Sequence, residues 1–336
     1  MLTAKQVEKR YDYVGATDVS AILGENRWKS RSDVWYEKVH RVSSFAGSEA
    51  ADLGNRLETA VRDLAADALG VHVVSSNPFR VVAGTPIGVN LDAWFDRGGV
   101  TIPVEVKTAG LMNPHWAGMD EWGEDWSDQI PTQYTLQLHA QMMATNAPEA
   151  YLSGLIAGRG HAMFHVERSE DLCEMIREAS IDFWACVQER RDPGDLPSLA
   201  TLAAIQRPPA SVAGLGVDAA GVVARWRRAV DLANAADDAV DEAKLGVIAA
   251  LGEAECGLFD TPLPADAADE LSVSAGVDAG EIRDRCFLSY REQARSGIDA
   301  SILRRDYPEA FEAAQKISTF RVLRMGKTPK GTEVTV

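Results

Sequence analysis

Two carboxylates and a lysine fall on short runs of β-forming residues. Glu105 and Lys107 are separated by one residue, so on a strand both project from one face while Val104 and Val106 pack into the core. Asp92 stands 13 positions before Glu105, at the end of another apolar run. If the two runs pair as a hairpin, the carboxylates meet, and like charges that close need a cation between them. The pattern favours Mg²⁺ or Mn²⁺, which prefer carboxylate and water oxygens.

A third carboxylate, Glu58, lies on a predicted helix about one turn from Val61, at the margin of the apolar face. A fully solvated glutamate is more often found on the opposite side of a helix. Taken alone, each of these residues has an ordinary interpretation: a Glu-x-Lys pair on a strand is usually an exposed ion pair of little energetic value. Their order along the chain, on these elements, favours a common site.

The elements that must position these residues indicate an α/β or α+β layer structure. We expect helices at 32–39, 54–69, 131–145 and 170–189, and strands at 71–74, 79–82, 89–95, 104–107, 151–157 and 162–168. The last two strands are joined by a glycine-rich turn, which predicts a hairpin.

A proline-rich stretch, residues 192–216, has the composition of a linker and predicts a domain boundary between residues 1–191 and 217–336. Beyond it, a three-four apolar spacing from Val223 to Leu251 predicts one long helix. Packing of this helix on its own domain is favoured over an intermolecular coiled coil. A strand at 286–292, a helix at 300–315 and a strand at 319–325 are expected to follow.

Composition limits the class of protein to which the chain can belong. The chain of 336 residues is 46% hydrophobic and 25% charged, as in an ordinary globular protein, and no apolar run approaches the roughly 20 residues that cross a bilayer. The amino terminus lacks the apolar core of a signal peptide, which predicts a cytoplasmic protein. Four widely spaced cysteines without a CxxC motif favour neither a disulfide scaffold nor a cysteine-ligated metal.

Charge is segregated along the chain. The net charge is −16, but residues 283–336 hold 11 Lys and Arg against 7 Asp and Glu, a net of +4, which leaves −20 for the remainder. Arginines of this basic segment are candidates for DNA contact, or else for pairing with neighbouring acidic residues; the two interpretations carry equal weight. They are Arg291, Arg295, Arg304, Arg305, Arg321 and Arg324.

Several ordered blocks resemble the YqaJ-like viral recombinase family, relatives of lambda exonuclease among the PD-(D/E)XK nucleases. The resemblance covers Arg10 to about Trp184. Its blocks are residues 15–24, 28–35, 54–58, 130–137, and Asp92 with Glu105-Val106-Lys107. Short C-terminal runs near Tyr290, Tyr307 and Phe320 are similar to tails of phage members.

The resemblance implies a restriction-endonuclease-like core, with a central mixed sheet flanked by helices. It implies a hydrolase that digests one strand of linear double-stranded DNA from its 5′ end, in phage-type homologous recombination. Glu58, Asp92, Glu105 and the Val106 carbonyl would hold two metal ions, and Lys107 would activate the attacking water. A single-strand annealing protein is the implied partner, and a homo-oligomer, a trimer as in the lambda exonuclease ring, the implied assembly.

Three further residues match family positions. Gln137 would position the water or a metal-bound phosphate, although it also fits a polar helical stripe with Gln133 and Gln141. Arg10 and Thr17 match an arginine and a serine that grip the terminal 5′-phosphate, a role that suits the guanidinium fork. Threonine keeps the serine hydroxyl but adds a methyl group, and Arg10 also fits a surface position.

Other motifs give weaker indications of function. His161 and His165 have no third zinc ligand nearby and are expected to be ordinary strand histidines. Residues 326–328 lack the upstream glycine of a phosphate-binding loop, so no nucleotide cofactor is expected. The acidic segment with Trp116, Trp122 and Trp126 is expected to pack against the helix at Tyr134, or alternatively to cover the active site or steer the displaced strand. A nicking or structure-specific endonuclease, and a non-catalytic DNA-binding recombination scaffold, remain the alternative functions.

Overall fold

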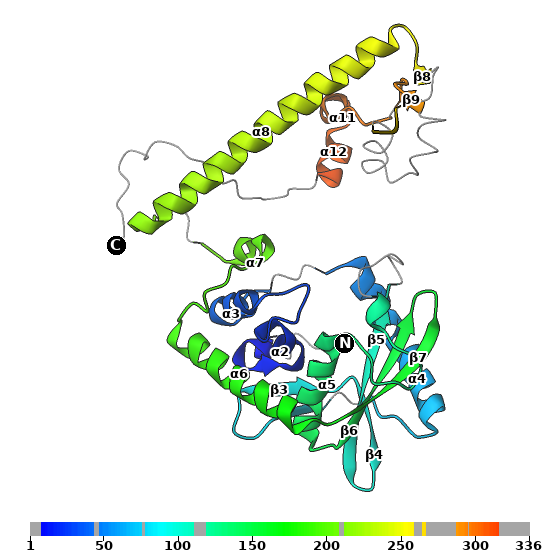
Figure 1. The fold of residues 1–336 in the computed structure, drawn as a ribbon, viewed down its shortest axis with the longest axis vertical. Helices are drawn as coiled ribbons and strands as arrows, with labels where there is room; N and C mark the ends of the chain where they lie inside the picture. The colour runs from blue at the N-terminus through cyan, green and yellow to red at the C-terminus, as the bar shows by residue number, and fades with distance from the viewer. Residues whose placement is uncertain are drawn as a thin grey trace. The chain divides into compact units, whose positions relative to one another are not determined.

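The computed structural model describes residues 8–43, 47–75, 78–110, 119–207, 212–258, 264–266, 287–294 and 296–315. The chain divides into two compact units, Met1–Pro208 and Pro209–Val336 (Figure 1). None of the described helices has the length and apolarity needed to pass through a bilayer.

Two sheets form the framework of the first unit. The smaller has the order β1–β3–β2, with β1 parallel and β2 antiparallel to β3. The larger has the order β4–β5–β6–β7, in which only the β5–β6 pair is parallel. The strands are β1 (Val14–Gly15), β2 (Phe79–Val81), β3 (Ile87–Asn90), β4 (Ala93–Arg97), β5 (Val100–Ala109), β6 (Glu149–Ile156) and β7 (Gly160–Glu167). These mixed sheets with flanking helices confirm the predicted α/β class.

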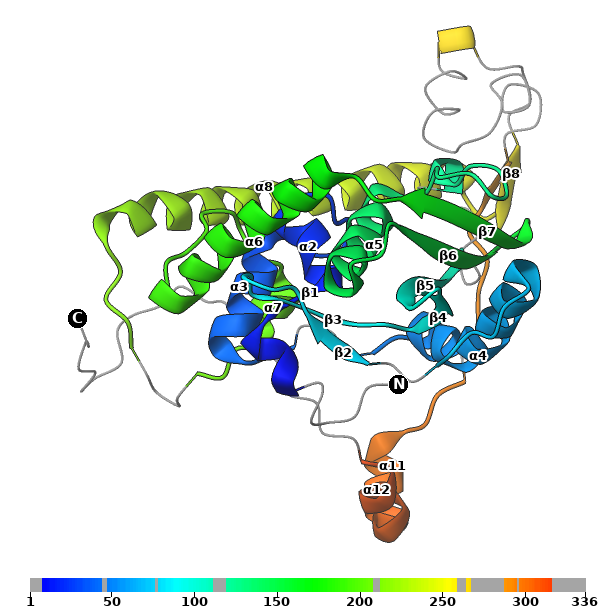
Figure 2. The ribbon, with the colours of Figure 1, turned by 90° about the horizontal axis from the view of Figure 1, so that it is seen from below.

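Helices α4 (Glu49–Leu69) and α5 (Thr132–Thr145) cover opposite faces of the larger sheet. Ser153 stands beside Val106 on one face, where its hydroxyl donates to the Val61 carbonyl of α4. Glu105 points from the other face toward α5. Figure 2 shows α2, α3, α5 and α6 gathered beside the smaller sheet. The remaining helices of this unit are η1 (Arg10–Asp12), α2 (Ala16–Ile22), α3 (Arg31–His40), η2 (Met119–Glu121), α6 (Glu170–Glu189) and α7 (Leu199–Ala204).

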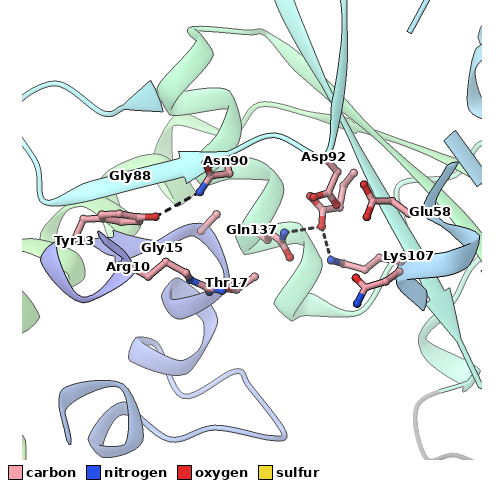
Figure 3. Close-up of a pocket in the computed structure, with 13 residues that line it drawn as sticks. Arg10, Tyr13, Gly15, Thr17, Glu58, Gly88, Asn90, Asp92, Lys107 and Gln137 are labelled. Atoms are coloured by element: carbon pink, nitrogen blue, oxygen red, sulfur yellow. Dashed lines mark hydrogen bonds and ion pairs between the residues drawn. The ribbon is translucent and has the colours of Figure 1, made fainter. Parts of the chain in front are cut away.

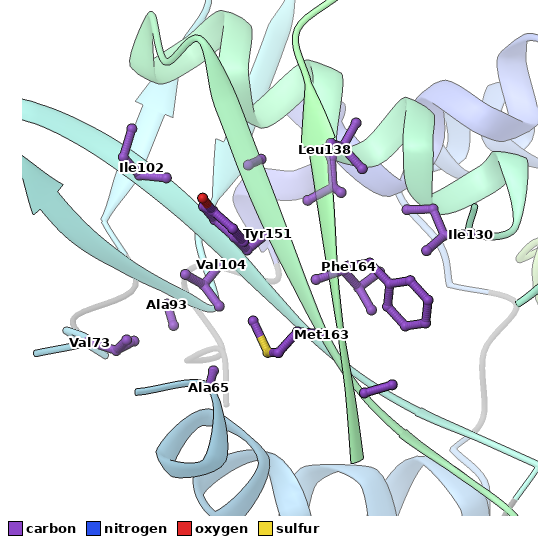
Figure 4. Packing of buried hydrophobic residues seen from close by; sticks show 14 of the residues in the cluster. Ala65, Val73, Ala93, Ile102, Val104, Ile130, Leu138, Tyr151, Met163 and Phe164 are labelled. Carbon is purple, nitrogen blue, oxygen red and sulfur yellow. The ribbon is translucent and has the colours of Figure 1, made fainter. Parts of the chain in front are cut away.

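Apolar side chains of the first unit form two clusters. One lies around the larger sheet and includes the fully buried Ile102, Leu138 and Phe164 (Figure 4). The other joins the smaller sheet to α2, α3, α5 and α6 around Ile87 and Phe183. Burial of each such side chain stabilises the fold by about 1.5–3 kcal/mol. The clusters therefore fix the sheets and helices that carry the polar residues described below.

Two strand predictions were wrong in detail. Residues 89–95 were expected to form one strand, but they divide between β3 and β4, which belong to different sheets. Leu91 and Asp92 lie at this break, where the backbone leaves one sheet and enters the next. Residues 71–74 form no strand; Val74 makes only an isolated bridge to Trp94.

The predicted linker, residues 192–216, is only partly an extended connection. It contains α7, and the segment before α7 is tied to α3 by hydrogen bonds. The Ser32 hydroxyl donates to the Asp195 carboxylate at 2.7 Å, and the Ser198 amide donates to Asp33 at 2.7 Å. Residues 195–198 thus pack against α3 within the first unit.

The second unit contains the long helix α8 (Val217–Leu251), of which no residue is buried. The expectation that this helix packs on its own domain stays a prediction. Strands β8 (Cys256–Leu258) and β9 (Phe287–Ser289) pair antiparallel. The helix predicted at 300–315 is two helices, α11 (Ala300–Asp306) and α12 (Pro308–Ala314), because a proline is tolerated only in the first turn of a helix.

Some sequence expectations fall outside the described residues: the strand at 319–325, residues 326–328, Cys286 and Trp116. Of the other cysteines, Cys173 and Cys186 are buried free thiols, and Cys256 is also a free thiol.

Candidate active site

The break between β3 and β4 places Asp92 beside β5. Strand β4 pairs with β5 in antiparallel register, Ala93 opposite Val104, so the residue before β4 meets the residues after Val104. The Val106 amide donates to the Asp92 carboxylate at 3.4 Å. The hairpin predicted to bring Asp92 to Glu105 is thus present, with β4 rather than β3 as its first strand.

Glu105 is the most constrained residue of the site. Its side chain is only 1% exposed, and each of its two carboxylate oxygens accepts a hydrogen bond from α5. Gln137 donates to one oxygen at 2.6 Å and Gln141 to the other at 2.6 Å, while the Lys107 ammonium pairs with the first oxygen. These donors lock the carboxylate in one orientation, which is what a metal ligand or catalytic base requires.

Glu58 reaches the same pocket from α4. The helix approaches β5 closely here, since a Cβ on Gly54 would lie 3.2 Å from the Thr108 hydroxyl. Glu58, Asp92, Glu105, Lys107 and Gln137 all line one pocket (Figure 3). The sequence-predicted set is therefore brought together from α4, β5, α5 and the β3–β4 connection.

Burial and the neighbouring charges both shift the pKa values at this end of the pocket. Burial, followed by the nearby charge of Glu105, raises the pKa of Asp92 to about 8, although Lys107 opposes the shift. Burial alone would lower the pKa of Lys107, but the charges of Glu105 and Asp92 outweigh it and raise that pKa. At neutral pH the site thus holds a protonated Asp92 beside an ionised Lys107.

The donor set fits a hard divalent cation. Among the described residues no three Asp, Glu, His or Cys side chains converge tightly enough to enclose an ion as they stand. Three carboxylates nevertheless share one pocket, and one of them, Asp92, keeps its proton because it is buried and lies beside Glu105. A cation there would replace that proton and offset the repulsion, as hard oxygen ligands allow.

Arg10 and Thr17 form the other end of the pocket (Figure 3). The Arg10 guanidinium donates to the Thr17 hydroxyl at 3.1 Å. Tyr13, Gly88 and Asn90 also line the pocket, and Asn90 donates to the Tyr13 hydroxyl at 3.4 Å. The pocket thus has a cationic end and an acidic end, and neutral side chains form part of its wall.

A buried ion pair holds the cationic end in place. Asp18 is 2% exposed; it accepts from the Gly15 amide at 3.0 Å and pairs with Lys38 at 2.6 Å and Lys29 at 3.3 Å. Burial would raise the pKa of Asp18, but these ammonium groups and Arg10 hold it well below its usual range. The turn from β1 into α2, which carries Thr17, is therefore fixed from beneath.

Sequence reasoning missed Gln141, the Asp18–Lys38 pair, and the pocket residues Tyr13, Asn55 and Asn90. The spacing of Gln133, Gln137 and Gln141 signalled one helical face, yet nothing in the sequence indicated that this face is buried against Glu105. Asp18 and Lys38 are 20 residues apart on separate helices, a pairing without a sequence signal.

The remaining candidate motifs have structural partners. His161 contacts the Ser153 hydroxyl at 2.9 Å, and His165 contacts Glu149 at 2.8 Å, so they share no ligand. Trp122 is buried, with its ring centroid 5.7 Å from that of Tyr134, which confirms the expected packing. Trp126 is 46% exposed.

Comparisons with known proteins find similarity over this part of the chain. Residues 6–148 match the YqaJ-like viral recombinase domain. The "Uncharacterized protein YqaJ" of Bacillus subtilis (strain 168) is 30% identical over 175 residues, which cover 51% of this chain and 52% of that protein. The chain thus spans about half the length of this relative.

Two solved structures are similar in part. An alkaline exonuclease (LHK-Exo) from Laribacter hongkongensis aligns at a TM-score of 0.45 and 14% identity, over 56% of this chain and 94% of that chain. A phage-related exonuclease from Haemophilus somnus 129PT aligns at 0.41 and 13% identity, over 53% and 96%.

Proposed function

We propose, on the premise that residues 6–148 form a YqaJ-like viral recombinase domain, that the protein is a metal-dependent DNA exonuclease. One observation carries the proposal: Glu58, Asp92, Glu105 and Lys107 gather from three parts of the fold into one pocket. Three carboxylates and a lysine form a donor set suited to metal-assisted phosphodiester hydrolysis.

Mg²⁺ or Mn²⁺ would be held by Glu58, Asp92, Glu105 and the Val106 carbonyl; such ions lower the pKa of bound water and stabilise developing charge on phosphate. Glu105 is kept in ligating orientation by Gln137 and Gln141. Lys107, ionised beside Glu105, orients the attacking water and offsets negative charge on the phosphate. Gln137 lines the pocket, where its amide also meets water or a phosphate oxygen.

The cationic end favours the 5′ end of a strand. Arg10 offers a planar pair of donors to a terminal phosphate, and the Thr17 hydroxyl beside it offers one more. The nucleotide between this phosphate and the next would span the pocket, so that the second phosphate meets the carboxylates. This arrangement supports 5′-to-3′ digestion of linear duplex DNA, in phage-type recombination with a single-strand annealing protein as partner.

Digestion of labelled linear duplex tests the proposal. With Mg²⁺ or Mn²⁺, the wild type releases a 5′ label before a 3′ label, and a chelator abolishes release. Arg10→Gln reduces the preference for a 5′-phosphate over a 5′-hydroxyl, whereas Arg31→Gln, which removes an exposed arginine paired with Asp182, does not. Cleavage of covalently closed duplex at the same rate would identify an endonuclease instead, and no cleavage of any substrate would leave a DNA-binding scaffold.

A further inference from the structure

The smaller sheet has one open face beside the candidate active site. Its other face is buried: Val14, Ile87 and Val89 are at most 1% exposed. Strand alternation therefore turns Gly88 and Asn90 the opposite way, and the register places Val81 and Phe79 directly across from them. Phe79 is 49% exposed and Val81 57% exposed, so large apolar groups face solvent here.

Gly88 makes room for two aromatic rings on this face. A Cβ at this position would lie 2.8 Å from the Phe79 ring and 2.9 Å from the Tyr13 ring, closer than side chains tolerate. The ring centroids of Tyr13 and Phe79 are 5.0 Å apart, with an interplanar angle of 51°. Glycine thus allows both rings to lie directly on the strand backbone as one aromatic surface.

Tyr13 is held in a fixed position within this surface. Its hydroxyl accepts a hydrogen bond from Asn90, and the Lys38 ammonium lies 5.8 Å from the ring centroid. A ring that is fixed before binding loses little entropy when a flat ligand stacks on it.

Tyr13 belongs both to the aromatic surface and to the pocket. Tyr13, Gly88 and Asn90 line the same pocket as Asp92 and Arg10 (Figure 3). Along β3 and the connection after it, Asn90 and Gly88 stand about 7 and 13 Å from Asp92, given a rise of about 3.3 Å per residue. A nucleotide whose phosphates occupy the two ends of the pocket would carry its base over this wall.

We propose that Tyr13 and Phe79, seated over Gly88, form a stacking platform for an unpaired nucleobase, that of the terminal nucleotide. The inference rests on the proposed exonuclease function and adds a base-binding site to it. Every base has a π face, so stacking serves all four bases, as an enzyme that digests DNA of any sequence requires. The platform also gives the separated terminal base a partner that replaces its lost stacking in the duplex.

The test compares Phe79→Ala with the wild type on linear duplexes whose 5′-terminal nucleotide is either normal or abasic. On the normal end, Phe79→Ala raises KM about tenfold with kcat nearly unchanged, because one base–aromatic contact is lost. On the abasic end the wild type shows the same rise in KM, and Phe79→Ala raises the KM no further. Phe79→Trp restores the normal KM. Ile181→Ala, a half-exposed apolar residue of α6 outside the pocket, matches wild type on both ends.

Binding is measured separately from hydrolysis, with 2-aminopurine as the 5′-terminal base and the inactive Glu105→Gln variant. Stacking quenches the fluorophore, and Phe79→Ala in the same background relieves the quench. The stacking platform is overturned if Phe79→Ala changes KM equally on normal and abasic ends, or if it leaves the quenching unchanged. Either result leaves the proposed exonuclease function standing. Absence of hydrolysis by the wild type overturns the proposed function, and the fluorescence result still decides whether the rings bind a base.

Gly88→Ala provides a second variant, expected to displace the rings and to reproduce the Phe79→Ala effect if its melting curve stays cooperative.

Discussion

Asp92 is the residue whose protonation is most changed by its surroundings in the candidate site. Its pKa of about 8, raised by burial and by Glu105, lies far above the 3.8 of a free side chain. Between about pH 4 and 8, the unfolded chain has released this proton and the folded chain has not. Folding of the metal-free protein therefore takes up a proton in this range, and stability falls as pH rises.

Urea unfolding in the presence of chelator measures this effect. Asp92 is expected to contribute a decline of up to about 1.4 kcal/mol per pH unit to the free energy of unfolding. Asp92→Asn removes the titrating group, so its stability varies less with pH. If the free energy of unfolding of the two proteins varied with pH in parallel, Asp92 would be ionised without metal. That result would contradict the raised pKa of Asp92.

Binding of a divalent metal ion should restore the stability that the metal-free protein loses as the pH rises. Because Mg²⁺ or Mn²⁺ binds the folded site and not the unfolded chain, it raises the melting temperature of the wild type. The shift is larger above pH 8, where no proton must leave Asp92, than near pH 6. Asp92→Asn should show a smaller shift, and calorimetric melting with and without metal at both pH values checks this. A wild type without any metal-dependent shift would count against the site.

At the level of elements, the path of the chain between sheets decides where the carboxylates meet. Alternation in residues 104–107 was enough to predict that Glu105 and Lys107 share a face, and the apolar face of α4 placed Glu58 at its margin. The break at Leu91-Asp92 was not predictable, because a run of β-forming residues gives no sign that its two halves pair in different sheets. Gln141 and the Asp18–Lys38 pair depend on tertiary packing and so had no local signal.

The Asp18–Lys38 pair is expected to be structural support for the cationic end. Asp18→Ala leaves the buried Lys38 ammonium without its main partner, which should cost about 3–5 kcal/mol of stability. Asp182→Ala breaks the more exposed pair with Arg31 and should cost at most about 1 kcal/mol. Urea denaturation of the two variants compares them directly. Similar losses in both would mean that the Asp18 pair contributes no more than a surface contact.

At the scale of the whole molecule, the second unit supplies surfaces without an assigned role. Helix α8 repeats apolar residues at three-four spacing, and two of them on one stripe, Val240 and Val247, are 51% and 44% exposed. We predict that this stripe joins copies of the chain into the expected homo-oligomer. Val240→Asp with Val247→Asp should dissociate it. Leu232→Asp with Leu245→Asp, two exposed leucines off the stripe, should not. Light scattering at micromolar concentration distinguishes these outcomes, and a monomeric wild type would contradict the prediction.

The basic C-terminal segment provides a separate test. Among its described arginines, Arg305 pairs with Asp306 at 2.8 Å, as the purely structural interpretation expects, and the guanidinium of Arg304 lies 4.7 Å from the Phe311 ring centroid. If the segment still contacts phosphate, deleting residues 283–336 weakens duplex binding. It also flattens the slope of log K against log salt by roughly 0.9 per lost contact. An unchanged slope in a folded truncation would place the DNA-binding surface within the first unit.

The most direct test of the central claim is the rate at which Glu105→Gln releases nucleotides from linear duplex DNA at saturating Mg²⁺. Glutamine keeps the size of the side chain but removes the charge that a metal ligand needs. We expect at least about a hundredfold loss of rate with DNA binding retained. Glu149→Gln is the matched control, since this carboxylate on the same sheet pairs with Arg97 and His165 and not with any residue named in the candidate site. It should digest DNA as the wild type does. Digestion by Glu105→Gln at the wild-type rate would contradict the account.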